Sequence, residues 1–249
     1  MKAIIIGAGR GRRLMSLTED APKCFAEIGG RRILDWILEA FSAAGIEEIV
    51  FVGGYQIEKV REAYPNFRFY YNKEWNHNNI LVSLFCAEAE MDDGFVCTYS
   101  DILYRPSIVR SLMEREYDIT LTVDTDWRAR YTKRTLHPES DAEKVSAERD
   151  RIIQIGRHID SDEAHGEYIG LAKFNRRGAE VLRTHYHRVR RVLAGRPFQD
   201  APSVEKAYLI DLLQELTDQG TPMYKVDTEG GYMEIDTTQD YWIALKEWK

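Results

Sequence analysis

Cysteines, long apolar runs and an excess of positive charge are scarce or missing in this sequence. The chain has three cysteines, and Cys86 and Cys97 lie in apolar segments without metal-ligand spacing, which predicts buried free thiols in a reducing compartment. No apolar stretch is long enough to span a bilayer, and the first residues show no signal-peptide pattern. We therefore expect a cytoplasmic protein without an integral membrane segment.

The net charge is negative, at −7, because acidic residues outnumber lysine and arginine. A general nucleic-acid binder needs a basic surface, so we expect no nucleic-acid partner. Against this background, four positive side chains gather around one glycine-rich loop: Arg10, Arg12, Arg13 and Lys23. Anion binding at that loop is the first functional hypothesis.

The loop follows three isoleucines, Ile4–Ile6, and reads GAGRG over residues 7–11. Three branched apolar residues predict a buried strand of a parallel sheet. Glycine lets the backbone approach a ligand closely, so a cationic, N–H-rich loop at the end of that strand suits a polyphosphate, with a positive φ expected at Gly9. An ordinary strand-to-helix turn with surface arginines is the alternative.

Two familiar phosphate-binding fingerprints do not fit the loop. In a dinucleotide-binding fold, Arg12 would have to be the third glycine, and the second strand should end in an acid rather than in Gly53-Gly54. A Walker A loop also fails, because Lys23 lies too far away and lacks the Gly-Lys-Ser/Thr context. The sequence therefore indicates a polyphosphate loop with a distant lysine.

Apolar periodicity alternates between strand and helix along the whole chain. That alternation predicts an α/β fold, with a single three-layer domain over residues 1–249 and a mostly parallel, mixed, Rossmann-like sheet. The segments 124–150 and 195–206 are expected as insertions near the site. The expected strands are 4–6, 49–52, 67–71, 95–99, 119–123, 152–155, 168–174, 223–226 and 232–235, and the expected helices are 33–45, 56–64, 80–91, 176–193, 204–216, one from Pro106 and one capped by Thr237 with Asp240.

Two acidic residues follow predicted strands. Ligands of such sheets bind at the carboxyl ends of the strands, and Asp101 is there in the right place for Mg²⁺, which prefers carboxylate and phosphate oxygens. Asp236 follows a strand and precedes a helix, so it is either a second metal ligand or the N-cap of that helix. For Asp101, the alternative is a turn-forming aspartate.

Short motifs are spread over nearly the whole chain: Gly7-Ala8-Gly9-Arg10-Gly11-Arg12-Arg13-Leu14, Leu17-Thr18, Pro22-Lys23, Asn78-Asn79, Ser83-Leu84, Ser100-Asp101, Glu167-Tyr168-Ile169-Gly170, Glu234-Ile235-Asp236 and Gln239-Asp240-Tyr241. This ordered set resembles the nucleotidyltransferases of the sugar-phosphate and phosphocholine type, and within them the bacterial phosphocholine cytidylyltransferase branch. Two positions depart from the pattern. Gly7 stands where alanine is usual, and Met15-Ser16 stands where a proline is frequent.

The resemblance implies an Mg²⁺-dependent nucleotidyltransferase with the nucleotide-diphospho-sugar transferase fold. Such an enzyme moves a nucleoside monophosphate, here CMP from CTP, onto a small phosphorylated acceptor and releases pyrophosphate, and a phosphocholine-type acceptor is favoured. Related branches act on sugar 1-phosphates, other phosphorylated polyols, phosphonates and amino-acid-derived acceptors, so these stay open. A nucleotide-sensing relative without catalysis is the alternative of another class, although sensing does not need a metal pair.

The resemblance also implies roles for individual residues. In the catalytic set, Lys23 would neutralise the α-phosphate and the acceptor phosphate, and Arg13 would face the leaving phosphates. Asp101 belongs to the same set and would hold magnesium together with Asp236. The nucleotide-binding set is Gly7, Ala8, Gly9, Gly11, Gly54, Asn78 and Ser83, of which the last two could instead cap the helix near Ile80.

The acceptor set combines aromatic faces for a quaternary ammonium with acids for a cationic or hydroxylated group. It comprises Trp127, Glu167, Tyr168, Tyr208 and Glu234, with Tyr232 as a further ring, and core packing is the alternative for the aromatic residues. The basic helix 176–193 is interpreted as a solvated face, with a membrane-surface or partner site as the alternative. The histidines form no motif.

Overall fold

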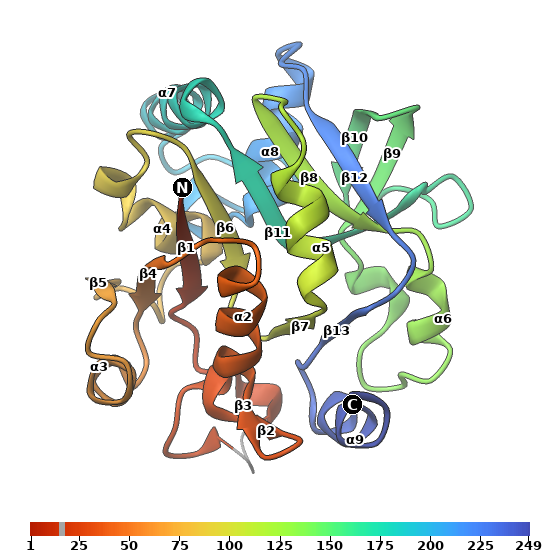
Figure 1. The fold of residues 1–249 in the computed structure, drawn as a ribbon. Helices are drawn as coiled ribbons and strands as arrows, with labels where there is room; N and C mark the ends of the chain where they lie inside the picture. The colour runs from red at the N-terminus through yellow and green to blue at the C-terminus, as the bar shows by residue number, and fades with distance from the viewer. Residues whose placement is uncertain (15–17) are drawn as a thin grey trace.

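A nine-stranded sheet runs through the molecule in the order β5-β4-β1-β6-β11-β8-β12-β10-β9 (Figure 1). The structure is a computed structural model that describes residues 1–14 and 18–249. The strands of this sheet are β1 (Lys2–Gly7), β4 (Glu48–Gly53), β5 (Arg68–Tyr71), β6 (Phe95–Tyr99), β8 (Ile119–Asp124), β9 (Lys144–Glu148), β10 (Arg151–Gly156), β11 (Gly166–Phe174) and β12 (Tyr224–Thr228). Two short ribbons pair β2 (Glu27–Ile28) with β3 (Arg31–Arg32) and β7 (Ile102–Tyr104) with β13 (Tyr232–Glu234).

One side of the sheet is parallel and the other is mixed. β5, β4, β1 and β6 run parallel to one another, whereas β11 pairs antiparallel with both β6 and β8. The α/β fold with a mixed sheet is confirmed, but antiparallel pairs are more extensive than expected. One cause is a short connection, because β9 and β10 are joined by Arg149 and Asp150 alone, which allows only antiparallel pairing. Part of the segment 124–150, namely 144–148, therefore belongs to the sheet and not to an insertion.

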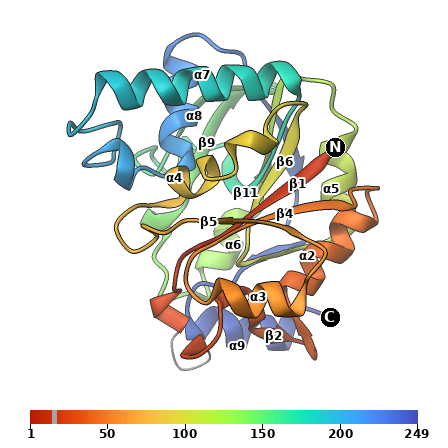
Figure 2. The same ribbon diagram turned by 90° about the vertical axis from the view of Figure 1, so that its left-hand side faces the viewer.

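Helices cover both faces of the sheet, as the view turned by 90° shows (Figure 2). One face carries α2 (Ile33–Ser42) and α5 (Pro106–Met113), and the opposite face carries α4 (Ile80–Phe85), α7 (Arg176–Val192) and α8 (Leu209–Asp218). Further elements are α3 (Ile57–Ala63), α6 (Trp127–Tyr131), α9 (Thr238–Glu247) and the 3-10 turns η1 (Arg12–Leu14), η2 (Lys23–Phe25), η3 (Glu88–Glu90), η4 (Glu139–Asp141) and η5 (Val204–Lys206). Within the described residues, no helix combines the length and apolarity needed to cross a membrane.

The two faces of β1 contribute to two separate hydrophobic cores. Ile4 and Ile6 belong to the core under α4, α7 and α8, while Ala3 and Ile5 belong to the core under α2 and α5. Full burial of one isoleucine side chain stabilises the fold by about 1.5–3 kcal/mol. Because both faces are covered, this strand reads as a continuous apolar run, and its carboxyl end is a rigid support for the glycine loop.

The carboxyl ends of the parallel strands meet at one edge of the sheet. There Gly7 at the end of β1 lies opposite Gly53 at the end of β4. The ribbon of β7 and β13 extends this edge, and the backbone N–H of Ile235 donates to the carbonyl oxygen of Asp101 at 2.8 Å. Asp101 and Asp236, which are far apart in the sequence, are therefore neighbours in space.

Candidate active site

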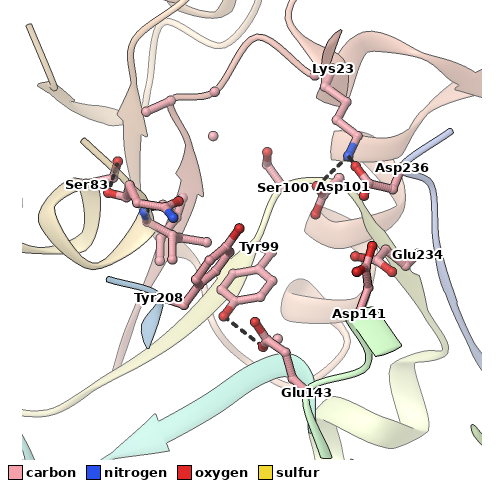
Figure 3. A pocket seen from close by; sticks show the side chains of 18 of the residues that line it. Lys23, Ser83, Tyr99, Ser100, Asp101, Asp141, Glu143, Tyr208, Glu234 and Asp236 are labelled. Atoms are coloured by element: carbon pink, nitrogen blue, oxygen red, sulfur yellow. Dashed lines mark hydrogen bonds and ion pairs between the residues drawn. The ribbon is translucent and has the colours of Figure 1, made fainter. Parts of the chain in front are cut away.

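A cavity of about 450 Å³ opens at this edge of the sheet (Figure 3). Small-molecule sites commonly have volumes of about 300–1,000 Å³. Most of the residues singled out in the sequence line it: Gly7, Ala8, Gly9, Gly11, Arg13, Lys23, Asn78, Ser83, Asp101, Glu167, Tyr168, Tyr208, Tyr232, Glu234 and Asp236. The cavity thus collects the loops that follow the strands, as expected for an α/β sheet.

Lys23 lies at the centre of a cluster of ion pairs. Its Nζ is 2.7 Å from Oδ2 of Asp101 and 2.5 Å from Oδ1 of Asp236, and Figure 3 shows these three side chains meeting at one corner of the cavity. The guanidinium of Arg13 pairs with the other carboxylate oxygen of Asp236. Burial alone would lower the pKa of Lys23, but its two carboxylate partners outweigh burial and raise it. The lysine is therefore a fixed and permanently charged donor.

Asp101 presents an oxygen atom that fits a hard cation, next to the carboxylate of Asp236, whose two oxygens pair with Lys23 and Arg13. Oδ1 of Asp101 is buried and has no hydrogen-bond partner among the described residues. Burial would raise the pKa of Asp236, yet Lys23 and Arg13 lower it overall, so this carboxyl is ionised at neutral pH. Carboxylate oxygens are the protein ligands that Mg²⁺ prefers, and the donor set of this pair therefore suits that ion.

The N-cap alternative for Asp236 is wrong. The N-cap of α9 is the next residue, Thr237, whose side chain accepts a hydrogen bond from the N–H of Asp240 at 3.2 Å. The carboxylate of Asp240 accepts from the N–H of Thr237 at 2.8 Å in return, which completes the capping box that the sequence predicts. Asp236 is therefore free of a capping role, and its carboxylate points to Lys23.

The glycine loop is defined by close packing. A Cβ on Gly7 would lie 2.6 Å from Cζ of Phe51, so the ring of Phe51 occupies the space that an alanine side chain would need. Gly11 has a φ of 65°, and a Cβ there would lie 2.9 Å from Cδ of Lys23. The positive φ expected at Gly9 is thus found at Gly11, because the loop turns where it passes the lysine. Around a Cβ on Gly9 there is open space.

Gly54, which the resemblance assigns to the nucleotide, lies behind the loop and is not part of the cavity lining. A Cβ at this position would lie 2.6 Å from the carbonyl oxygen of Ala8 and 2.6 Å from Cβ of Trp75. The N–H of Tyr55 donates to the same carbonyl at 2.9 Å. The assignment is therefore corrected: Gly54 acts indirectly, by letting the backbone of Ala8 approach β4.

Asn72, which the sequence motifs do not include, organises one end of the cavity. Its Nδ2 donates to Oδ1 of Asn78 at 2.7 Å and to Oγ of Ser83 at 2.9 Å, and Asn78 donates back at 3.0 Å. The hydroxyl of Ser83 donates to the carbonyl oxygen of Asn79 at 3.2 Å, so Ser83 has only lone pairs left for a ligand. Neither Asn78 nor Ser83 caps α4, because the side chain of Asn79 accepts from the N–H of Ile80.

Aromatic and charged side chains form another end of the cavity. The hydroxyl of Tyr99 donates to Oε2 of Glu143 at 3.2 Å, and Figure 3 shows this pair with Tyr208 nearby. Nη2 of Arg157 lies 3.6 Å from Oε1 of Glu143, and the Arg157 guanidinium lies 4.0 Å from the ring centre of Tyr208. Burial raises the pKa of Glu143 to about 8, although Arg157 acts in the opposite direction.

Two residues of the predicted acceptor set have other partners. Trp127 does not line the cavity, because it packs with Tyr131 and Ala142 in a small separate core and is 3% exposed. Glu167 does line the cavity, but its Oε1 accepts from the hydroxyl of Tyr131 at 2.6 Å and its Oε2 pairs with Arg130. Trp127 is therefore removed from the set, and Glu167 is an anchor for α6.

Among the described lining residues that belong to no sequence motif, four carry an imidazole, carboxyl or guanidinium group: His137, Asp141, Glu143 and Arg157. The first three lie in the segment 124–150, whose charge and irregular pattern placed it near the site. No local spacing identifies them individually. One signal was available for Arg157: it lies two residues after a predicted strand, as Asp101 does.

The basic helix 176–193 corresponds to α7, which does not contribute to the cavity lining. Its residues Leu182, Tyr186 and Val189 face the core, while most of its arginines lie at the surface. The departure at Met15-Ser16 and the first residue of Leu17-Thr18 lie outside the described residues.

Comparisons with known proteins place the chain in a family. The MobA-like NTP transferase domain matches residues 3–195. CTP:phosphoglutamine cytidylyltransferase from Campylobacter jejuni subsp. jejuni serotype O:2 is 30% identical over 257 residues, which cover 99% of this chain and 100% of that protein. Choline-phosphate cytidylyltransferase from Streptococcus pneumoniae is 28% identical over 120 residues, 47% of this chain and 52% of that protein.

Solved structures share the fold. The inositol-1-phosphate CTP transferase from T. maritima superposes with a TM-score of 0.74 at 24% identity, over 99% of this chain and 96% of that chain. The CTP:phosphocholine cytidylyltransferase from Streptococcus pneumoniae superposes with a TM-score of 0.73 at 20% identity, over 100% and 99%. The resemblance that the motifs carry is thus confirmed, and the chain belongs to the MobA-like NTP transferase domain family of nucleotidyltransferases.

Proposed function

We propose that the protein transfers a cytidylyl group from CTP to the phosphate of a small phosphorylated acceptor and releases pyrophosphate. The activities named for two relatives support this proposal. One relative is a phosphoglutamine cytidylyltransferase, and the other is a choline-phosphate cytidylyltransferase. The observation that carries the proposal is Lys23, a charged donor that Asp101 and Asp236 fix at the corner of the cavity beside the glycine loop.

To catalyse this reaction, the protein mainly has to position the two substrates and to stabilise the negative charge of their phosphates. An oxygen of the acceptor phosphate forms a bond to the α-phosphorus of CTP, and the bond from that phosphorus to the bridging oxygen of pyrophosphate breaks. The nucleophile is already anionic, so no strong general base is needed. Lys23 stabilises the charge on the α-phosphate, and Arg13, whose side chain is half exposed, meets the leaving phosphates. Backbone N–H groups of residues 7–11 hold the triphosphate.

The reaction depends on Mg²⁺, which Asp101 and Asp236 would hold. The buried, unpartnered Oδ1 of Asp101 and the ionised state of Asp236 support this assignment. An ion bound there would neutralise phosphate charge and orient the triphosphate. A sensor that binds nucleotide without catalysis would need the glycine loop but not this pair of acids with Lys23 between them.

Pyrophosphate release tests the proposal directly. Purified protein is given each of the four NTPs with Mg²⁺ and, in turn, choline phosphate, phosphoglutamine, 2-aminoethylphosphonate and sugar 1-phosphates. We expect release that requires both CTP and an acceptor, and that stops when EDTA removes the divalent cation. Binding of CTP without release in the presence of any acceptor would establish the sensor instead.

Lys23→Ala should lower kcat by about 10²–10³-fold, because one preorganised donor of this kind is worth about 2.7–4 kcal/mol in the transition state. Lys246→Ala is the matched control, since Lys246 is exposed on α9 and lies outside the cavity lining. A higher KM with an unchanged kcat would mean that Lys23 contributes only uniform substrate binding.

A further inference from the structure

Arg157 lines the cavity with an incomplete set of partners. Among the described residues its one ion pair is with Glu143, and the distance of 3.6 Å from Nη2 to Oε1 is longer than a hydrogen bond. Its Nε is buried and has no hydrogen-bond partner among those residues. Burial raises the pKa of Glu143 to about 8, so this carboxyl is mostly protonated at neutral pH. Most of the Arg157 charge is therefore not balanced by the protein.

A guanidinium in such a place suits a carboxylate or a phosphate, each of which it can bind through two parallel hydrogen bonds. Two parallel N–H groups of arginine match the two oxygens of a carboxylate, a geometry that lysine cannot reproduce. The phosphates of the proposed reaction already have partners in Lys23 and Arg13, and Figure 3 shows the Lys23 corner well apart from Glu143. The anion for Arg157 is therefore a group other than the reacting phosphates.

A quaternary ammonium does not match this end of the cavity as well. The guanidinium of Arg157 lies over the ring of Tyr208 at 4.0 Å, and that of Arg130 lies over the ring of Tyr232 at 4.5 Å. Two of the aromatic faces expected for choline are thus already in contact with fixed positive charges. A second cation on the same rings would meet repulsion of like charges.

We propose that the acceptor carries a carboxylate, and that Arg157 binds it. The inference rests on the proposed function and selects, among the acceptor classes left open, a phosphorylated amino-acid derivative. Glu143 stands beside Arg157, and its protonated carboxyl can donate a hydrogen bond to the same carboxylate. The hydroxyl of Tyr99 engages Oε2 of Glu143, which leaves Oε1 for the ligand.

Matched acceptor pairs that differ only in the carboxylate test the inference. O-phosphoserine is compared with phosphoethanolamine, and glutamine phosphorylated on its side-chain amide is compared with its decarboxylated analogue. Calorimetry measures binding to the protein saturated with a CTP analogue that cannot be cleaved, with phosphocholine as a third head group. We expect the carboxylated member of at least one pair to bind about tenfold more tightly or better, because a charge-assisted hydrogen bond is gained.

Substitutions then assign the preference to Arg157. Arg157→Gln should abolish the difference within the pair and leave the affinity for the decarboxylated member unchanged. Arg157→Lys keeps the charge without the planar fork and should retain part of the difference. Arg151→Gln, at an exposed arginine of β10, the strand that precedes Arg157, is the control and should leave the preference intact.

Equal binding within both pairs, or tighter binding of phosphocholine than of every carboxylated acceptor, would overturn the inference and leave the proposed function standing. A lack of pyrophosphate release with every acceptor would overturn the proposed function instead. The calorimetric comparison decides the carboxylate preference in either case, since it does not depend on turnover.

Discussion

Ser83 offers a ligand only lone pairs, because its hydroxyl hydrogen is used on the carbonyl oxygen of Asn79. Asn72 keeps Ser83 in this acceptor role, because its Nδ2 donates to the Ser83 hydroxyl oxygen while its Oδ1 accepts from the N–H of Glu74 at 3.1 Å. The side-chain amide of Asn72 cannot rotate by 180° without losing its hydrogen bonds to Ser83 and Glu74. Cytosine presents an exocyclic amino donor where uracil presents a carbonyl acceptor. We therefore predict that Ser83, as an acceptor, favours cytosine over uracil if the base binds at this end of the cavity.

Ser83→Ala should accordingly lower kcat/KM for CTP by about tenfold, the effect of one net hydrogen bond, and leave the value for UTP nearly unchanged. Competition assays with both nucleotides measure the change in selectivity. Ser42→Ala, at an exposed serine of α2, is the control. Equal losses for CTP and UTP would show that Ser83 does not read the base.

Glu143 makes stability depend on pH. Burial raises its pKa to about 8 in the folded protein, against an ordinary value of 4.5, with Arg157 opposing and Glu234 and Glu167 adding to the shift. The folded state thus binds a proton that the unfolded state has lost, and the free energy of unfolding falls as pH rises from about 4.5 to about 8. Each unit of pKa shift corresponds to about 1.4 kcal/mol.

Glu143→Gln should remove this dependence, because glutamine cannot ionise. Thermal unfolding without ligands should show the variant gaining in Tm over the wild type between about pH 5 and about pH 8.5. A constant difference in Tm across that range would contradict the raised pKa.

At the scale of elements, the segment 133–143 reaches the cavity because α9 and β13 hold it. Nε of Arg134 donates to Oδ1 of Asp240 at 2.7 Å, and its Nη2 lies 3.3 Å from Oε2 of Glu234. The side-chain oxygen of Gln239 accepts from two backbone N–H groups of the segment at 2.8 and 3.0 Å. The wall of the cavity is thus fastened to the helix that follows Asp236.

Arg134→Met should destabilise the protein by about 3–5 kcal/mol at neutral pH, because buried Asp240 loses its cation. Burial raises the pKa of Asp240, but hydrogen bonds from His137 and Arg134 lower it by more, so the stabilisation is present at neutral pH and is lost as pH falls. Urea unfolding should show a smaller difference from the wild type at about pH 3 than at about pH 7.

The neighbouring Lys133→Met is the matched control for this prediction. Lys133 is exposed and pairs with Glu247 at the surface, and such pairs contribute about 0–1 kcal/mol. If Arg134→Met cost no more than Lys133→Met, the ion pairs of Arg134 would not be what fastens the segment.

Elements with a clear apolar period could be predicted from the sequence, and short or charged ones could not. β1 and β4 are buried on both faces, so their runs of isoleucine, valine and phenylalanine are visible in the sequence. β9 reads Lys-Val-Ser-Ala-Glu, and only Val145 and Ala147 are apolar in it. Its place in the sheet depends on β10 and β11, which a local pattern does not report.

At the scale of the whole molecule, the sequence predicts which strand ends meet but not every side chain that they bring together. The glycine loop and Asp101 follow buried strands directly, so local pattern is enough to place them. Glu143 precedes β9 and Arg157 follows β10, so the two residues meet at the open end of the β9–β10 hairpin only when those strands pair. Trp127 shows the reverse case, because its aromatic character fits a ligand site while its packing belongs to a separate core.

The two ends of the cavity come largely from different stretches of the chain. Residues 7–101 supply the glycine loop, Asn72, Ser83 and Lys23, whereas Glu143, Arg157 and Tyr208 come later; Tyr99 and Asp236 are the exceptions. Substitutions at Glu143, Arg157 or Tyr208 can therefore change the acceptor specificity without altering the glycine loop or Lys23. In this way a lineage can acquire a new acceptor while it keeps its nucleotide. The names of two relatives are consistent with this: the phosphoglutamine and choline-phosphate enzymes are both cytidylyltransferases, and their acceptors differ.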